Sequence, residues 1–518
     1  MNVKERALWM LQRLVPDSGV SNEALVFAVR GRLDVAVLGR QLERLIRRHP
    51  ALRTVFPELH GVPSAVVMPD SLADVQVVLD PPPSPVESAI GEFVSVAFDL
   101  TRQPPIRVGV WRYPDGDVCC LVLHHIVYDA WTAGVLFTEL VAGYNSEVDN
   151  TELSESLTEP AEIHVEAAPS EAGLTYWREH VAGVDPRAQR LVMSRERPAT
   201  STFAGATRRH EMSGPARAAA GKLAQRHRAT ENIVLLAAYY LLLAEHGAGP
   251  DVVVGVSVDV RGKGDRGTVG YHVNTLPVRM AVSPAGTAGD LVQAMRKTFF
   301  AGLRHRDVPY EAVQPDLGDT GSDWRTPLFR HMFNYRPVPL PQRTLLGGST
   351  VEILDVPPGH SRQDLEFIVE TAADGRGWVR AVYSTEVFDE SDIAALQERY
   401  DNLLMALAAN EEYVLAGSAV HKPPAVRDDQ NQVPQVVSSE LGGELDDTVV
   451  ALVDLWRDVL RNPGLGPRDN FFLSGGHSLV AVRMLVKVAK KTGAELTLDM
   501  LLEHPTAVGF AQHVRKAV

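Results

Sequence analysis

Apolar positions in the first 415 or so residues follow two alternating patterns. Residues 36–50, AVLGRQLERLIRRHP, space apolar side chains three and four positions apart, which is typical of an amphipathic helix. Residues 251–260, DVVVGVSVDV, form a short and nearly continuous apolar run, which is typical of a strand. Because such segments alternate along this part of the chain, we expect an α/β or α+β architecture.

The pattern changes over residues 420–444, where Pro, Gln, Ser and Asp dominate and no hydrophobic period continues. This composition predicts a flexible linker, with an r.m.s. span on the order of 27 Å. Helical spacing returns in residues 446–460 and in residues 478–493, which end at a glycine. Residues 445–518 are therefore expected to form a small all-α bundle that can move relative to the preceding part.

Composition narrows the class of protein. Of 518 residues, 45% are hydrophobic and 22% are charged, which is ordinary for a globular protein, and this length predicts about three folding units. The net charge of −14 includes no basic block, so neither nucleic acid nor an anionic membrane is an expected partner. The cysteines, Cys119 and Cys120, are adjacent and cannot form a disulfide framework, so we expect reduced core residues.

Two apolar segments could be mistaken for membrane or targeting signals. Residues 233–244 are strictly apolar but are shorter than the roughly 20 residues of a membrane-spanning helix, so they predict a buried helix. Residues 1–15 have amphipathic periodicity and lack the cleavage site of a signal peptide. The expected location is the cytoplasm.

A histidine doublet follows the apolar run 119–123, in the stretch LHHIVYDAWTAG. Successive strand residues face opposite sides, so His124 and His125 should point apart, which argues against joint metal ligation. One imidazole would pack as support and the other would face a cavity. Asp129 falls near the start of a helical pattern, where it could cap backbone N–H groups or pair with a cation. Isolated histidines and aspartates in such places are usually structural, so other motifs must decide.

The doublet with its spaced aspartate resembles the HHxxxDG signature of nonribosomal peptide synthetase condensation domains, of the chloramphenicol-acetyltransferase-like superfamily. Further motifs follow in that family's order: RRHPALRTVF (47–56), TYWREHVAG (175–183), VGYHVNTLPVR (269–279), RHRDVPYEAV (304–313) and RTPLFRHMFNY (325–335). The resemblance implies two α/β lobes, residues 1–170 and 171–419, that meet in a V around a tunnel. The doublet would lie at the midpoint of the tunnel.

The resemblance also implies roles for individual residues. His125 is the catalytic candidate, His124 is its structural neighbour, and Asp129 is expected to pair with Arg279 across the lobe contact. Ala130 stands where the family usually has glycine, and its methyl group would narrow the tunnel. A neutral imidazole suits the chemistry, because an amine that attacks a thioester must lose a proton. The imidazole would act as a base or would stabilise the oxyanion, and the sequence does not choose between the two roles.

A second motif, DNFFLSGGHSLVAV, resembles the phosphopantetheine attachment site of carrier proteins, and LLEHPTAVGFA (501–511) resembles the closing segment of the same family. A glycine-rich loop would present Ser478 at a helix N-terminus, where a phosphate group is favourable. The resemblance implies that Ser478 carries a covalent 4'-phosphopantetheine, added by a phosphopantetheinyl transferase. Two alternatives are a simple serine helix cap and a G-x-S-x-G nucleophile elbow, of which the second lacks its final glycine and its preceding strand.

Together the motifs predict an acyltransferase of the condensation–carrier type, expected as a monomer without metal. It would form an amide between an upstream carrier-bound thioester and an amine on the arm of Ser478. No adenylation motif stands between the two parts, so a trans-acting adenylation enzyme would load the carrier. Alternatives are ester formation, transfer to a soluble acceptor, and a catalytically silent recruitment domain.

Overall fold

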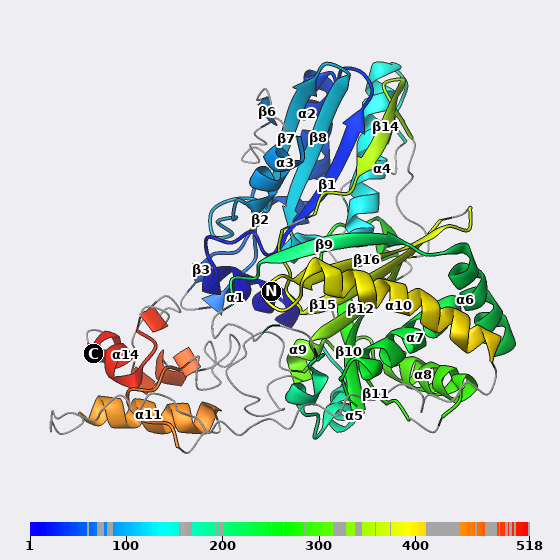
Figure 1. Ribbon diagram of the computed structural model, residues 1–518. Helices are drawn as coiled ribbons and strands as arrows, with labels where there is room; N and C mark the ends of the chain where they lie inside the picture. The colour runs from blue at the N-terminus through cyan, green and yellow to red at the C-terminus, as the bar shows by residue number, and fades with distance from the viewer. Residues whose placement is uncertain are drawn as a thin grey trace.

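The computed structural model describes most of residues 1–410 and parts of residues 446–515. Within the first range it leaves out residues 60–61, 70–76, 80–85, 155–156, 158, 160, 162–167, 193–194, 196–200, 250, 263, 284–285, 314–327, 337–343, 358 and 373. Within the second it leaves out residues 461–463, 472–483, 486, 490, 493–495, 497–499 and 502–503. Two α/β lobes, one above the other in Figure 1, make up the larger part.

The upper lobe is a six-stranded sheet in the order β13-β14-β1-β8-β7-β6, with helices on both faces. Cys119 belongs to the core under α2 and α4, whereas Cys120 belongs to the core under α1 and α3, as expected for adjacent strand residues. Both thiols are free and buried, which confirms the prediction of core cysteines. The elements of this lobe from the N-terminal part of the chain are α1 (Val3–Leu14), β1 (Asn22–Val29), α2 (Val35–Arg48), η1 (Pro50–Arg53), β2 (Thr54–Val55), β3 (Glu58–Leu59), β4 (Val62–Pro63), β5 (Val66–Val67), β6 (Val77–Leu79), α3 (Val86–Ser95), β7 (Ile106–Tyr113), β8 (Gly116–His124), η3 (His125–Val127) and α4 (Ala130–Val148).

The lower lobe is a second six-stranded sheet, in the order β11-β10-β12-β15-β16-β9. Its apolar face packs on the central helix α7, whose residues from Ile233 to Ala244 are all buried, as the sequence predicts. Its elements are α5 (Glu171–Val181), η5 (Pro186–Gln189), β9 (Gly205–Glu211), α6 (Gly214–Arg226), α7 (Glu231–Glu245), β10 (Asp251–Asp259), η6 (Asp265–Gly267), β11 (Val273–Ala281), α8 (Ala288–Leu303), α9 (Tyr310–Val313), β12 (His331–Arg336), β15 (Leu365–Thr371), β16 (Gly377–Ser384) and α10 (Glu390–Ala409).

One segment of the second predicted lobe joins the sheet of the first, which corrects the contiguous lobes predicted from sequence. Strands β13 (Thr344–Leu346) and β14 (Ser349–Leu354) lie within the range assigned to the second lobe, yet they extend the sheet of the first. Strand β14 pairs antiparallel with β1, with Val26 opposite Leu354. Pairing with β14 satisfies the backbone groups on that side of β1 and ties the lobes together.

The C-terminal part is helical where the structure describes it. Helices α11 (Asp447–Leu460) and α14 (Ala507–Arg515) contact each other around Trp456, which is fully buried and lies edge-on to Phe471 with ring centroids 4.9 Å apart. The predicted linker and Ser478 lie outside the described residues. No helix among the described residues is long and apolar enough to cross a lipid bilayer.

Candidate active site

The histidine doublet lies where β8 ends, at the junction of the two lobes. His124 is the last residue of β8 and its side chain is fully buried, with its ring edge-on to Phe98 at 6.3 Å between centroids. His125 begins the short helix η3 and keeps 14% of its side chain exposed to the cavity between the lobes. The expectation that one imidazole packs and the other faces a cavity is confirmed.

Hydrogen bonding fixes the orientation of the His125 ring. Its Nδ1 lies 2.6 Å from the carbonyl oxygen of Tyr128, and a carbonyl can only accept, so Nδ1 carries the proton in the neutral ring. The lone pair is therefore on Nε2. The ring of Tyr271, from the lower lobe, packs edge-on against the imidazole with centroids 4.9 Å apart. Nε2 is the nitrogen left for chemistry, and Glu23 Oε1 lies 3.8 Å from it.

The surroundings of both histidines favour the neutral ring. Burial lowers the pKa of His125, and Arg362 lowers it further, while Glu23, the Tyr128 carbonyl and Asp129 act in the opposite direction. Burial, together with His125 and Arg362, lowers the pKa of His124 to about 3. At neutral pH the Nε2 of His125 is thus an available proton acceptor.

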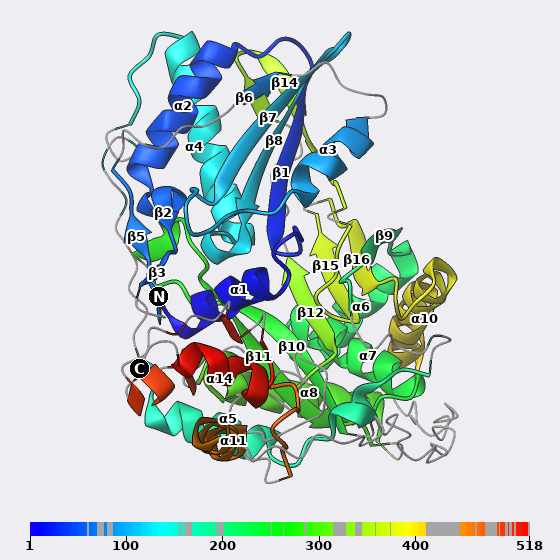
Figure 2. The same cartoon turned by 90° about the vertical axis from the view of Figure 1, so that its left-hand side faces the viewer.

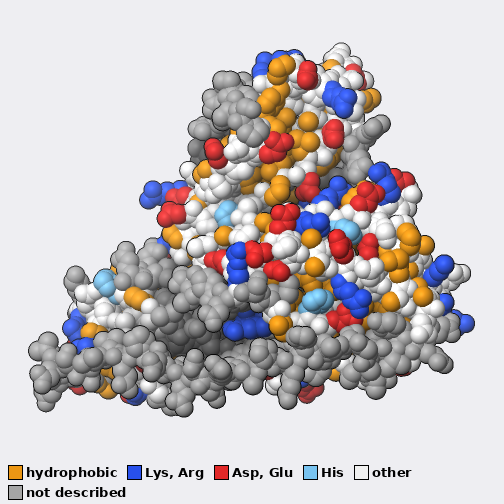
Figure 3. Space-filling view, in the orientation of Figure 1, with side chains coloured by type: hydrophobic (Ala, Val, Ile, Leu, Met, Phe, Trp, Pro, Cys, Tyr) orange, Lys and Arg blue, Asp and Glu red, His pale blue; other side chains and the backbone are white. Residues whose placement is uncertain are grey.

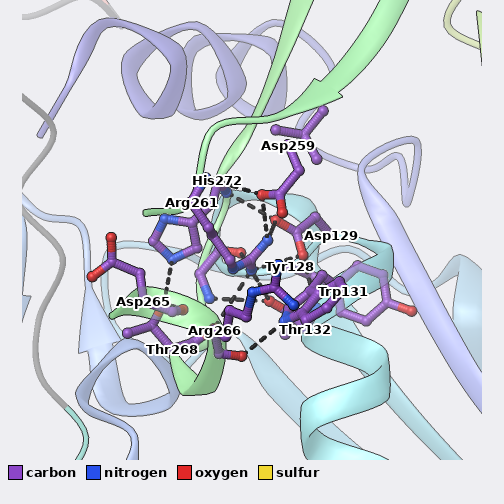
Figure 4. A network of polar contacts seen from close by, with 12 residues as sticks. Tyr128, Asp129, Trp131, Thr132, Asp259, Arg261, Asp265, Arg266, Thr268 and His272 are labelled. Atoms are coloured by element: carbon purple, nitrogen blue, oxygen red, sulfur yellow. Dashed lines mark hydrogen bonds and ion pairs between the residues drawn. The ribbon is translucent and has the colours of Figure 1, made fainter. Parts of the chain in front are cut away.

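Asp129 connects the lobes through a buried network (Figure 4). As the N-cap of α4, it accepts the backbone N–H of Thr132 at 2.8 Å, and it accepts that of His272, from the lower lobe, at 2.9 Å. Arg261 binds both carboxylate oxygens, each at 2.9 Å, and both side chains are 1% exposed. Burial raises the pKa of Asp129, but Arg261 and the backbone donors outweigh it, and the net shift is downward. Asp129 thus both caps the helix and pairs with a cation, the two roles that its position offers as alternatives.

The predicted partner of Asp129, Arg279, is wrong. Arg279 lies within β11 and binds Asp251, with Nε to Oδ2 at 2.8 Å. On this strand Asp129 contacts His272, just before β11 begins. Arg279 lies further along β11, about 20 Å from that contact. Arg261 follows the end of β10, at the end of the β10–β11 hairpin that faces the upper lobe. It therefore reaches Asp129 where Arg279 cannot.

Nearby contacts reinforce the lobe junction around this ion pair. The hydroxyl of Thr132 donates to the Gly270 carbonyl at 2.9 Å, and the indole N–H of Trp131 donates to the Arg266 carbonyl at 2.8 Å. Lys4 Nζ, on α1, donates to the Val273 carbonyl at 3.1 Å. Since these donors all belong to the upper lobe and the acceptors to the lower, the residues around the doublet are held from both sides.

A cavity of about 1420 Å³ opens between the lobes and includes His125, Trp131 and Tyr271 in its wall. This exceeds the roughly 300–1,000 Å³ of ordinary small-molecule sites. The cavity leaves room for a pantetheine arm beside the imidazole. Ser478, which would carry that arm, lies outside the described residues.

One wall of the cavity is the polar face of the lower sheet. Alternate residues of β12 and β15 point into it, among them Asn334 and Arg336 on one strand and Glu366 and Glu370 on the other. Figure 3 shows acidic and basic side chains side by side where the lobes meet. The sheet thus packs its apolar face on helices and presents charged groups to the cavity. Ala130, exposed at the first position of α4, also lines the cavity.

Sequence reasoning missed Arg261, Glu23 and Tyr271. Arg261 lies two positions past a buried strand and directly before a glycine. This pattern marks the end of a strand but does not show which lobe Arg261 faces. Glu23 interrupts the apolar pattern of β1, a signal that could have indicated a strand edge exposed to a cavity. Tyr271 directly precedes His272, within the motif quoted above, and its contact with His125 depends on how the lobes pack.

Comparison with known proteins places these features in a family. An isonitrile lipopeptide synthase of Mycobacterium tuberculosis is 29% identical over 440 residues, covering 80% of this chain and 17% of that protein. The chondramide synthase of Chondromyces crocatus is 28% identical over 424 residues, covering 78% of this chain and 11% of that protein. This chain thus spans about a sixth or less of the length of these curated relatives.

Solved structures share the fold. A complex of the X-domain and OxyB from teicoplanin biosynthesis matches with a TM-score of 0.70 at 22% identity, over 81% of this chain and 95% of that chain. The first condensation domain of the calcium-dependent antibiotic synthetase matches with a TM-score of 0.64 at 20% identity, over 80% of this chain and 97% of that chain. The condensation domain model matches residues 2–417, and the phosphopantetheine attachment site model matches residues 450–514. This chain belongs to the condensation domain family and continues into a carrier domain of the type that bears 4'-phosphopantetheine.

Proposed function

We propose that this protein forms an amide bond between an acyl or peptidyl thioester on a donor carrier and an amine tethered to the phosphopantetheine of its own Ser478. One observation carries the proposal: His125 presents an unprotonated Nε2 to a large cavity between two lobes, with Nδ1 committed to the Tyr128 carbonyl. His124, fully buried beside it, serves as structural support.

The reaction requires a proton acceptor at this place. An α-amino group has a pKa of about 7.7–8.0, so near neutrality most of it is ammonium and cannot attack a carbonyl carbon. The neutral imidazole of His125 accepts or shares the proton, or its protonated form donates to the oxyanion. Phosphopantetheine, when bound, supplies the flexible thioester arm that brings the acceptor in. The Asp129–Arg261 pair acts on structure, since both side chains are buried and bound to each other.

Tethering supports the use of the chain's own carrier for the acceptor. A linker of the length expected from the sequence would keep the acceptor near the cavity at an effective concentration of about millimolar. A strong interface between carrier and condensation domain is then unnecessary. The donor carrier enters from the other side of the cavity.

The proposal implies further partners. A phosphopantetheinyl transferase would modify Ser478, and an adenylation unit that lies outside residues 1–518 would load it. These two loading reactions use coenzyme A and a nucleotide, which are substrates of the cytoplasm. The cytoplasm is the proposed location of the protein.

Intact-protein mass spectrometry tests this function. Ser478 is converted with a phosphopantetheinyl transferase, loaded with an aminoacyl group and mixed with acylated donor carrier, and the mass on the arm is followed. We expect product from the wild type and a rate at least about 100-fold lower from His125→Ala. The matched control is His227→Ala, a half-buried histidine at the end of α6 that does not line the cavity. Ser478→Ala should gain no arm.

Equal rates from the wild type and His125→Ala would overturn the catalytic role of His125. Product with a hydroxyacyl acceptor but not with an aminoacyl acceptor would favour ester formation. Binding of a partner enzyme without any transfer would favour a recruitment domain.

A further inference from the structure

A carboxylate stands beside the reactive nitrogen of His125, and the mechanism above does not use it. Glu23 is the second residue of β1 and lies opposite Leu123, the residue before the histidine doublet. Its Oε1 is 3.8 Å from Nε2 of His125, and 39% of its side chain is exposed to the cavity. Among the described residues, no hydrogen-bond donor or other cation reaches the Glu23 carboxylate. A charged group is thus aimed into the cavity with its hydrogen-bonding capacity unused.

Other carboxylates near the doublet are already engaged. Asp129 is bound by Arg261 and by two backbone N–H groups. Asp355 and Glu370, deeper in the cavity, both bind Arg380 at 2.9 Å. Glu366 also lines the cavity, but burial raises the pKa of its carboxyl group and so opposes its ionisation. Glu23 is therefore the carboxylate that a cation arriving at His125 would meet.

The spacing suits an ammonium nitrogen. A tetrahedral nitrogen that donates to two acceptors at roughly 2.9 Å holds them about 4.7 Å apart. The observed 3.8 Å between Glu23 Oε1 and His125 Nε2 is too long for a good hydrogen bond. A small rotation of the partly exposed Glu23 side chain would widen this distance to about 4.7 Å. One substrate nitrogen could then donate to Glu23 and to His125 together.

The charges around the cavity favour the same place. Arg362 and Arg336 line the cavity and would repel a cation elsewhere on that wall. Arg362 also lowers the pKa of His125, whereas Glu23 raises it. Without Glu23 this end of the cavity would hold one fewer negative charge, which disfavours both an ammonium and a protonated imidazole.

We propose that Glu23 binds the amino group of the acceptor beside His125 and thereby selects an amine over a hydroxyl acceptor. This inference rests on the proposed function and names the acceptor class of the same site. An ammonium makes a charge-assisted hydrogen bond to Glu23, which is roughly twice as strong as a neutral one. A hydroxyl acceptor has one proton and no charge, so it gains little from the carboxylate.

The ammonium held by Glu23 gives one proton to Nε2 of His125 and becomes an amine, which attacks the thioester carbonyl carbon to form the C–N bond. The nitrogen then loses a second proton, the C–S bond breaks, and the departing sulfur takes one proton to become a thiol. One proton per turnover passes to solvent. Glu23 is unchanged at the end, so its role is binding and positioning.

The test compares Glu23→Gln with the wild type on matched acceptors. Ser478 is loaded either with an aminoacyl group or with the corresponding α-hydroxyacyl group, and single-turnover transfer from an acylated donor carrier is measured at pH 7. We expect the variant to lose about tenfold or more with the amine and less than about twofold with the hydroxyl. The matched control is Glu352→Gln, an exposed glutamate on β14 of the same sheet that does not line the cavity. Equal losses with both acceptors, or no loss with the amine, would overturn the proposal.

A binding measurement separates this inference from catalysis. Stable pantetheine amides of an amino acid and of its hydroxy analogue are titrated by calorimetry into the full chain bearing Ser478→Ala. Glu23→Gln should weaken binding of the amino analogue by about tenfold and leave the hydroxy analogue unchanged. If both analogues bind the variant as they bind the wild type, Glu23 does not hold the amine. If the amino analogue binds through Glu23 but no transfer occurs, the proposed function fails while the amine site stands.

Discussion

Arg261 reaches across the lobe junction and binds both oxygens of Asp129, and each side chain keeps 1% of its surface exposed. Because the pair is buried, removal of one partner leaves the other charge without compensation. We expect Arg261→Ala to lower the free energy of unfolding of the condensation domain by about 3–5 kcal/mol, measured by denaturant titration. Transfer activity should fall with it, since Asp129 also anchors the residues after His125.

Arg279→Ala is the matched control for that measurement. Arg279 and Asp251 are 25% and 41% exposed, so solvent screens their interaction. The ion pair itself should contribute no more than about 1 kcal/mol. Although Arg279 also donates to the carbonyls of His180 and Ala182, the loss should stay below that of Arg261→Ala. Equal destabilisation by the two substitutions would contradict the assignment of Arg261 as the partner that matters for the junction.

The difference between these two arginines shows where sequence reasoning stops. Both lie on the β10–β11 hairpin. The pattern of apolar residues predicts a strand over residues 251–260 but not which of its ends meets the other lobe. The same reason explains why β13 and β14 were placed in the wrong lobe: a strand-like run does not tell which sheet it joins. These choices are made by packing between distant segments.

Features that depend on local patterns were predictable. The buried helix through Ile233–Ala244 follows from its unbroken apolar run, and the cap at Asp129 follows from its position before a helical period. The opposite environments of His124 and His125 follow from the end of a strand. The doublet lies at the strand end predicted for it, whereas two of the residues that support it, Arg261 and Tyr271, come from the other lobe.

The pH dependence of transfer should report the environment of His125. Burial and Arg362 lower its pKa, so the neutral ring persists below the usual value of about 6.5. In transfer measured from pH 5 to pH 8, the acid limb due to His125 should therefore lie below about 6.5. Arg362→Gln removes a cation that opposes protonation, so the acid limb should move to higher pH. Glu23→Gln removes an anion and should move it to lower pH.

If the acid limbs of the Arg362→Gln and Glu23→Gln profiles moved in the same direction, this electrostatic account would be contradicted. Glu352→Gln serves again as the control, because its carboxylate does not line the cavity. The thermal midpoint of each variant should be recorded across the same pH range, so that loss of folded protein is not read as loss of a neutral imidazole.

Stability in acid should depend on His124. Its pKa is lowered to about 3 in the folded protein, whereas an unfolded histidine has a pKa of about 6.5. Between these values the unfolded chain binds a proton that the folded chain does not, so the free energy of unfolding falls as the pH falls. Above about pH 6.5 the group has no effect on the pH dependence. Urea titrations at pH 7 and pH 5 measure this slope.

The substitution His124→Asn isolates that contribution. Nδ1 of His124 accepts the backbone N–H of Ile126 at 3.1 Å, and the Asn side-chain oxygen can accept the same bond without a titrating group. We expect the variant to lose less stability between pH 7 and pH 5 than the wild type, with transfer activity largely kept. An unchanged slope would mean that other groups account for the acid sensitivity.

We expect Ala130 to limit how much room the acceptor has beside the doublet. It is exposed at the first position of α4, directly after the Asp129 cap, and its methyl group faces the cavity that His125 lines. Ala130→Gly removes that methyl at a cost of at most about 1 kcal/mol in helix stability. We therefore expect faster transfer to acceptors with large side chains and unchanged transfer to a glycyl acceptor. Single-turnover rates on Ser478 loaded with glycyl, leucyl and tryptophanyl groups measure the effect, and a uniform change across the three would show that the methyl group acts on the helix start rather than on acceptor size.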